Sequence, residues 1–228
     1  MKNKLHFIVL IIILSGISIK TYPQAGTLDN TFGNNGIVTY NYSAGYHDFT
    51  YDVHVYDDGS ILACGGYMDD VNYNATGNMQ KFLPDGSIDN TWGTNGMITF
   101  QYGVSTIPST MVILQDGKIL LSGTTYLTAP DAEFFVARFH PDGSPDMTFN
   151  GTGVWTSAYA ADEELCNAMA LQPDGKIVLA GRTGTTVFNA LLFARLNSNG
   201  TLDSGFGTNG FTEINSATQN ENLNGLGL

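Results

Sequence analysis

Charged residues recur at fixed places in this 228-residue chain and are the first candidates for chemistry. One recurring position is an aspartate, found as Asp29, Asp89, Asp146 and Asp203. Another is basic, found as Lys81, Arg138 and Arg195. Such residues could form a ring of charges around a channel, or cation sites that also use Asn oxygens. We favour a simpler interpretation, in which each Asp caps its own turn and each basic residue pairs with a carboxylate of its repeat. The Asp-x-Asp-x-Asp-Gly pattern of a calcium loop does not occur.

Two acidic clusters and four histidines are the other candidates for acid–base or metal chemistry. Asp69-Asp70 and Asp162-Glu163-Glu164 could supply the two carboxylates of a glycosidase. We interpret them as solvated charges, because they lie in segments that do not repeat. The histidines, which show no metal-ligand spacing, are His6, His47, His54 and His140. The sequence therefore predicts no catalytic, cofactor-binding or metal-binding residue.

The recurring aspartates belong to an eleven-residue motif that occurs four times. The copy at 86–96 reads Gly-Ser-Ile-Asp-Asn-Thr-Trp-Gly-Thr-Asn-Gly, and the other copies begin at Gly26, Gly143 and Gly200. Successive copies start 57 to 60 residues apart over nearly the whole chain. A constant period of this length indicates a repeat architecture.

Four strands are expected in each repeat. The first follows the motif, the second and third flank an Asp-Gly turn, and the fourth ends at the turn that opens the next motif. The expected first strands are residues 37–42, 97–102, 154–159 and a copy that begins at Phe211. Asp-Gly between apolar runs predicts a type I′ hairpin turn. The segments between strands, such as 43–49, 67–74, 124–133 and 182–187, differ between repeats and are expected to be loops that carry a binding surface.

Four antiparallel strands in about 60 residues are typical of a propeller blade, whose faces are buried only by stacked neighbours. We expect an all-β partial β-propeller of about three and a half four-stranded antiparallel blades. Its expected divisions are a signal peptide at 1–25, blade repeats at 26–85, 86–142 and 143–199, and an incomplete fourth repeat at 200–228. Closed propellers usually have roughly four to eight blades. The chain is therefore not expected to close by itself.

The chain is acidic, with a formal net charge of −12 and a pI near 4.4. Nucleic acid and anionic membrane surfaces require clustered Lys and Arg, so both are excluded as expected partners. We attribute the acidity to solubility, with divalent cation binding as the alternative. The cysteines Cys64 and Cys166 lie in different parts of different repeats and are expected to be apolar core residues without a disulfide.

The amino terminus has the pattern of a secretory signal peptide. Lys2 and Lys4 precede an apolar run at 5–14, which is shorter than the roughly 20 residues of a membrane-spanning helix. Cleavage anywhere up to Ala25 leaves the repeats intact. We expect a secreted or cell-surface protein with no membrane contact after cleavage, and an uncleaved anchor is the alternative.

Three motifs recur in fixed order from residue 26 to about 215. They are Gly-Ser/Thr-Leu/Ile-Asp-x-Thr-Phe/Trp-Gly-x-Asn-Gly, Asp-Gly-Lys-Ile-Leu/Val and Ala-Arg-Phe/Leu, and together they resemble the delta-60 repeat family. The resemblance implies an exported bacterial β-propeller-like protein and brings no catalytic residues. The chain departs from the pattern at Pro145, Met147 and Asn150, and at Gln80-Lys81 where later repeats have Ala-Arg.

We expect an exported, non-enzymatic binding or scaffold module with a protein or glycan ligand and no cofactor. The open blade edges and faces are also expected to favour self-association. Two alternatives stay open. One is an enzyme on a propeller scaffold, such as a glycan hydrolase or lyase, and the other is a fragment of a longer propeller with no separate function.

Overall fold

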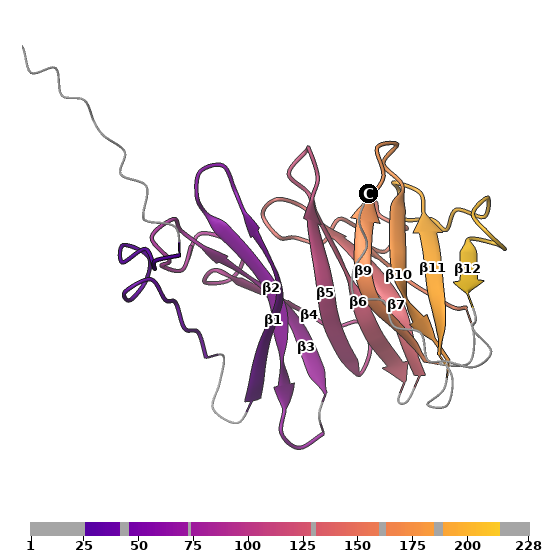
Figure 1. Cartoon of the computed structure of the whole chain (residues 1–228), viewed down its shortest axis with the longest axis horizontal. Helices are drawn as coiled ribbons and strands as arrows, with labels where there is room; N and C mark the ends of the chain where they lie inside the picture. The colour runs from indigo at the N-terminus through magenta and orange to yellow at the C-terminus, as the bar shows by residue number, and fades with distance from the viewer. Residues whose placement is uncertain are drawn as a thin grey trace, which may run out of the picture.

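The computed structural model describes residues 26–41, 46–72, 74–128, 131–159, 163–184 and 189–214. The described residues contain strands and turns and no helix, so none of them forms a helix that could cross a membrane. The expected signal peptide at 1–25 lies outside the described residues. Twelve strands form three four-stranded antiparallel sheets that stand side by side (Figure 1). The all-β partial propeller predicted from the sequence is confirmed.

Each sheet is a simple meander, in which strands adjacent in sequence are also hydrogen-bonded neighbours. The first sheet contains β1 (Tyr46–Val55), β2 (Ile61–Asp69), β3 (Ala75–Phe82) and β4 (Met97–Phe100). The second contains β5 (Ser105–Ile113), β6 (Ile119–Thr128), β7 (Asp131–Phe139) and β8 (Val154–Thr156). The third contains β9 (Glu164–Leu171), β10 (Ile177–Thr183), β11 (Ala190–Leu196) and β12 (Phe211–Ile214).

The Asp-Gly turns join the first two strands of each sheet, but they are not of type I′. In the first sheet, Tyr56 N donates to Ser60 O and Gly59 N donates to Tyr56 O, so the loop is longer than two residues. Gly59 has a φ of 84°, whereas Asp58 is not among the residues with positive φ. A turn of this kind needs one left-handed residue at its end, which explains the glycine. The Asp58 carboxylate accepts the Ser60 N–H at 2.8 Å and closes the turn.

The structural sheet and the sequence repeat are out of phase by one strand. The strand after each motif is the last strand of the sheet begun by the preceding repeat, as shown by the pairing of β3 with β4 from Gly77↔Phe100 to Gln80↔Met97. The expectation that it is the first strand of its own sheet was wrong. The sheets span 46–100, 105–156 and 164–214, whereas 26–85, 86–142, 143–199 and 200–228 describe the sequence period.

Among the described residues, the part of a repeat that completes no sheet therefore lies at the amino-terminal end. Residues 200–214 complete the third sheet through β12, whereas residues 26–41, which we call the leading segment, have no sheet of their own. The strand predicted at 37–42 is wrong for the described residues 37–41, where Ile37 makes isolated bridges with Gly33 and Asn34. In Figure 1 the leading segment is the indigo chain beside the first sheet.

Several predicted loops are strands. Tyr46–Phe49, expected to be part of a link, begins β1. Residues 124–128 and 131–133, also expected to be a loop, continue β6 and β7 to a pair at Thr128↔Asp131. These residues form strands because the hydrogen bonding between neighbouring strands continues past the part of the sequence that repeats. The variable part of each repeat is therefore mostly the ends of long hairpins.

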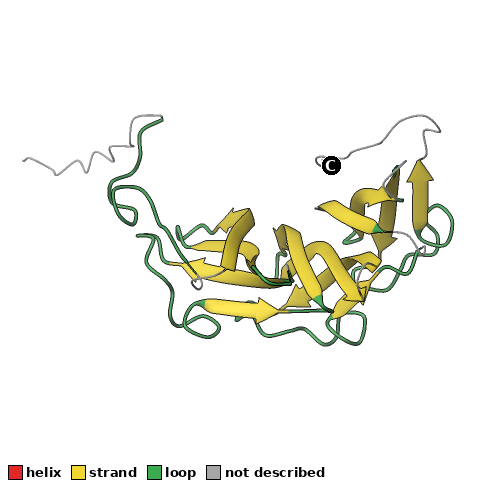
Figure 2. Ribbon diagram, turned by 90° about the horizontal axis from the view of Figure 1, so that it is seen from below, coloured by secondary structure: helices red, strands yellow, loops and turns green. Residues whose placement is uncertain are grey.

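Two apolar cores lie between the three sheets. Leu62, Cys64 and Met79 of the first sheet share one core with Leu121 and Phe135 of the second. The other core contains Phe134, Val136 and Leu120 of the second sheet with Leu179, Leu192 and Leu196 of the third. The second sheet is thus buried on both faces, which explains the nearly continuous apolar sequence of β7. Seen from below, the sheets follow one another in an open row (Figure 2).

Candidate functional site

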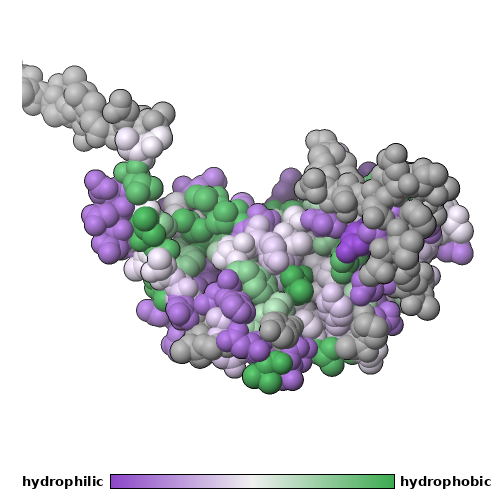
Figure 3. Space-filling model, turned by 60° about the horizontal axis from the view of Figure 1, so that its bottom comes forward, coloured by the Kyte–Doolittle hydropathy of each residue, from purple (hydrophilic) through white to green (hydrophobic). Residues whose placement is uncertain are grey.

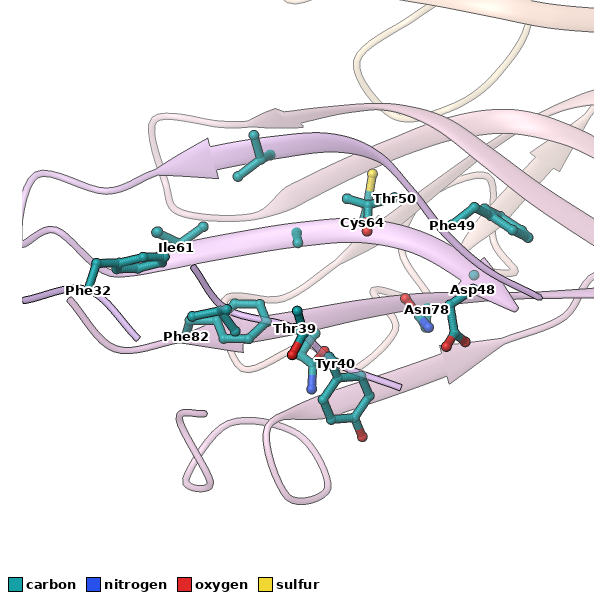
Figure 4. Close-up of a pocket in the computed structure, with 15 residues that line it drawn as sticks. Phe32, Thr39, Tyr40, Asp48, Phe49, Thr50, Ile61, Cys64, Asn78 and Phe82 are labelled. Carbon is teal, nitrogen blue, oxygen red and sulfur yellow. The ribbon is translucent and has the colours of Figure 1, made fainter. Parts of the chain in front are cut away.

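A groove of about 520 Å³ lies on the face of the first sheet that points away from the second sheet. Its floor is formed by residues of β1, β2 and β3, and Phe32 and Val38–Tyr40 of the leading segment cover it on one side (Figure 4). We call it the first-sheet groove. Figure 3 shows hydrophobic surface gathered toward the end of the molecule that carries the leading segment.

The leading segment lies on the first sheet as a later motif lies on the third. Gly33 N donates to Asp85 O at 2.7 Å, and Asn150 N at the equivalent position donates to Asn199 O at 2.7 Å. Side chains repeat the arrangement. Phe32 and Val38 lie close to Gly86, and Trp92 and Ile98 lie close to Gly143 in the same way. The roof of the groove is therefore a motif in its usual position, and among the described residues no strand of a further sheet lies behind it.

The floor of the groove departs from the equivalent face of the other two sheets. The pairs Ile61↔Phe82, Ile119↔Phe139 and Ile177↔Leu196 set the three sheets in register. In that register, the residues of the second and third sheets that pack on a neighbouring sheet are large and apolar or alanine. Three positions of the first sheet differ from their equivalents in the second and third sheets. The equivalents of Ala63 are Leu121 and Leu179, those of Asn78 are Phe135 and Leu192, and those of Gln80 are Ala137 and Ala194.

Gln80 is the most unusual of these residues. Its exposed fraction is 7%, and its amide Nε2 has no hydrogen-bond partner among the residues that the structure describes. A buried donor without a partner costs about 1–3 kcal/mol. The neighbouring repeats avoid this cost with alanine, so the amide at this position calls for an acceptor that the described residues do not supply.

The groove has an apolar end and a polar end. Phe32, Ile61 and Phe82 lie together at one end, whereas Asp48 and Asn78 lie toward the other (Figure 4). Tyr40 and Phe49 add two rings to the lining, and Thr39 and Thr50 add two hydroxyl groups. Phe49 and Asp48 come from the non-repeating segment 43–49, where a binding surface was expected. The aromatic residues of the motif and the amides of β3 were not predicted as part of a site.

The recurring charges form local ion pairs, as the simpler interpretation predicted, but not within one repeat. Because the sheets and the repeats are out of phase, each basic residue pairs with the aspartate of the following repeat. Arg138 Nε lies 2.8 Å from Asp146 Oδ2, and Arg195 Nε lies 2.8 Å from Asp203 Oδ2. The first copy of this pair is looser, with 3.8 Å between Lys81 Nζ and the Asp89 carboxylate.

The same aspartates also cap their turns. The Asp29, Asp89 and Asp146 carboxylates each accept the backbone N–H and the hydroxyl of the Thr two residues later. The hydrogen bond from Lys176, with further hydrogen bonds from Gly205 and Arg195, lowers the pKa of Asp203 to about 2. These aspartates therefore serve the fold.

The two acidic clusters do not form a catalytic pair among the described residues. Asp69 and Asp70 lie at the end of the first sheet, where Asp70 is 3.1 Å from His47 Nε2. Glu164 begins β9 in the third sheet, is fully buried and accepts the Ser157 hydroxyl at 2.6 Å. The interpretation as solvated charges is wrong for Glu164, because β9 begins earlier than expected, and Asp162 lies outside the described residues.

No group of three or more His, Cys, Asp or Glu residues suited to a metal ion occurs in the described part of the chain. Cys64 and Cys166 are free and buried, in the first and third sheets, so the prediction of core cysteines without a disulfide is confirmed. Burial raises the pKa of both thiols to about 12. Neither thiol is activated as a nucleophile.

Three segments, residues 57–91, 114–149 and 172–206, match the family model described as "Domain of unknown function (DUF5122) beta-propeller". Each match runs from an Asp-Gly turn through two strands into the following motif, so the matched unit is the same in all three sheets. No curated protein matches the chain.

Proposed function

Because the chain carries the repeats of a β-propeller-like family, we propose that it is a binding or scaffold module and not an enzyme. We assign it more narrowly to the delta-60 type of exported repeat protein. Two observations support a non-enzymatic role. The recurring aspartates are engaged in turns and ion pairs, and the acidic clusters belong to different sheets.

The observation that carries the proposal is the first-sheet groove. In the second and third sheets, the corresponding face is filled by the preceding sheet and lined by residues such as Phe135 and Leu192. In the first sheet it combines aromatic rings, hydroxyls and the amides of Asn78 and Gln80 around open space. Concave sites that mix apolar surface with a few polar groups are typical of ligand binding.

We place the protein outside the cytoplasm. The support is the pattern of Lys2 and Lys4 before the apolar run at 5–14, which is that of a signal peptide. Expressing the full chain in a bacterial host and sequencing the amino terminus of the exported product tests this assignment. Cleavage at or before Ala25 supports it, and retention of the intact chain in the cytoplasm contradicts it.

The binding role is tested with the purified chain immobilised on a sensor. A panel of purified glycans and extracellular proteins is passed over it, and release of reducing ends from the same glycans is measured separately. Saturable binding of at least one panel member without turnover supports the proposal. Absence of saturable binding rejects a binding role, and release of reducing ends would establish the enzyme alternative instead.

We also propose self-association through β1, which is an edge strand of the first sheet. Its residues Val53 and Val55 are 56% and 61% exposed, so this edge presents apolar side chains to solvent. Sedimentation equilibrium at increasing protein concentration tests this. A monomer at every concentration contradicts it.

A further inference from the structure

We propose that the first-sheet groove binds a neutral saccharide, with Asn78 and Gln80 as its polar contacts. The inference rests on the proposed binding function and adds a place and a ligand class to it. Nothing in the repeat itself requires these residues, since the equivalent positions of the other sheets are apolar.

The repeat shows how the groove is hollowed. Ala63 stands where Leu121 and Leu179 fill the two cores, and Asn78 stands where Phe135 and Leu192 do so. Both changes remove apolar volume from a face whose counterparts pack on another sheet. A fourth sheet of the same repeat would meet amides at the positions where the other interfaces are dry, and would leave them without partners. This face is therefore better suited to a polar ligand than to another blade.

The polar groups of the groove match the hydroxyl edges of a sugar. The unpartnered Nε2 of Gln80 requires an acceptor, which a hydroxyl or ring oxygen supplies. A hydrocarbon ligand would leave this donor unsatisfied. The Asn78 amide offers a further donor and a further acceptor on the same side of the groove, where Asp48 also lies (Figure 4).

The rings of the groove match the apolar faces of a sugar. Tyr40 and Phe49 line it with broad apolar surfaces, and Phe82 closes its apolar end. The charge of the lining decides between neutral and acidic sugars. The fifteen residues that line the groove include Asp48 and no Lys, Arg or His, so an anionic sugar would find no basic partner there.

The repeat also supplies variants that should fold. Gln80→Ala introduces the residue found at Ala137 and Ala194, and Asn78→Leu introduces the one found at Leu192. Gln80→Ala removes the Gln80 amide. Asn78→Leu removes the Asn78 amide and also fills part of the groove with an apolar side chain. Asn167→Leu is the matched control, because Asn167 is an exposed residue of a strand in the third sheet. Thermal melts verify that each variant retains the wild-type fold.

The probes are cellohexaose, xylohexaose, mannohexaose and chitohexaose, with alginate as an anionic polymer and digested gelatin as a source of peptides. We expect wild-type protein to bind at least one neutral hexasaccharide. Gln80→Ala and Asn78→Leu should each weaken that binding about tenfold or more, equivalent to about 1.4 kcal/mol, while Asn167→Leu leaves it unchanged.

The other outcomes overturn the inference in distinguishable ways. Binding of a neutral saccharide that both groove variants retain would place the site elsewhere and leave the binding function intact. Binding of alginate or gelatin peptides alone would reject the ligand class and still leave that function intact. If none of these probes and no member of the wider panel binds, the inference and the proposed function fail together.

Discussion

Removal of the Asp146 carboxylate should destabilise the protein strongly, although the residue belongs to no functional site. The residue is fully buried and its carboxylate accepts Arg138 Nε at 2.8 Å, Lys118 Nζ at 3.1 Å and the Thr148 hydroxyl at 2.6 Å. Asp146→Ala leaves a largely buried guanidinium without its carboxylate. Breaking a buried pair on one side costs about 3–5 kcal/mol, and we expect about 2–4 kcal/mol here because Lys118 retains contact with solvent and Asp116.

Urea unfolding followed by tryptophan fluorescence measures this loss, and Asp29→Ala is the matched control. Asp29 occupies the same motif position in the leading segment, but it is exposed and its side chain accepts hydrogen bonds from Thr31. Its removal should have little effect on the free energy of unfolding. In a thermal melt, the loss at Asp146 corresponds to a decrease of roughly 5–15 °C. Equal effects of the two substitutions would refute the argument that burial and basic partners stabilise this position.

The stabilisation by Asp146 should depend on pH in a defined direction. Burial alone would raise the pKa of this carboxyl, but hydrogen bonds from Thr148 and Lys118 and the charge of Arg138 outweigh it and hold the pKa well below its usual range. Because the folded pKa lies below the unfolded value of about 3.9, the stabilisation is complete above that value and is lost as pH falls through the folded pKa. The difference between wild type and Asp146→Ala should be constant from neutral pH to about pH 5 and shrink in more acidic solution. A difference that grows on acidification would contradict this assignment.

The remaining predictions concern turns and thiols. Gly143→Ala and Gly151→Ala both place a methyl group at positive φ, 84° and 76°, but only at Gly143 would it collide with Ile98. We expect about 1–2 kcal/mol of destabilisation at Gly151 from backbone strain and a larger loss at Gly143, and equal melting temperatures would contradict the packing argument. Cys64 and Cys166 should resist iodoacetamide at pH 8 in the native protein and react in guanidinium, as read by mass spectrometry, because burial raises the pKa of both thiols. Rapid alkylation of the native protein would show that these cores open.

The local features of the fold could be predicted because short segments determine them. The Asp-Gly turn and the apolar runs on either side of it were sufficient to locate strands such as β2 and β6. The residue at which each sheet begins could not be predicted, because a periodic sequence can be divided into blades at any point of its period. The pairing of β3 with β4, between residues about 20 positions apart, decides it. For the same reason residues 37–41 do not form the predicted strand: their pattern fits a sheet, but none of the described strands pairs with them.

The signal for the groove is present in the sequence as a departure from the repeat pattern, but the sequence alone does not connect it with a site. Gln80 departs from the Ala-Arg pattern of later repeats, and Asn78 lies two residues before it on the same face of the strand. Only the register of the sheets shows that Asn78 and Gln80 lie on the face that the second and third sheets use to pack on the preceding sheet. The open space beside them depends on the position of the leading segment, which no local pattern predicts.

Hydrogen–deuterium exchange with and without a bound hexasaccharide tests the central claim most directly, because it locates the ligand without any mutation. The claim is that the face of the first sheet under the leading segment is a binding surface. Slower exchange confined to residues 26–41 and to β1, β2 and β3 is the predicted result. Protection confined to the second or third sheet, with no change in these segments, would contradict it.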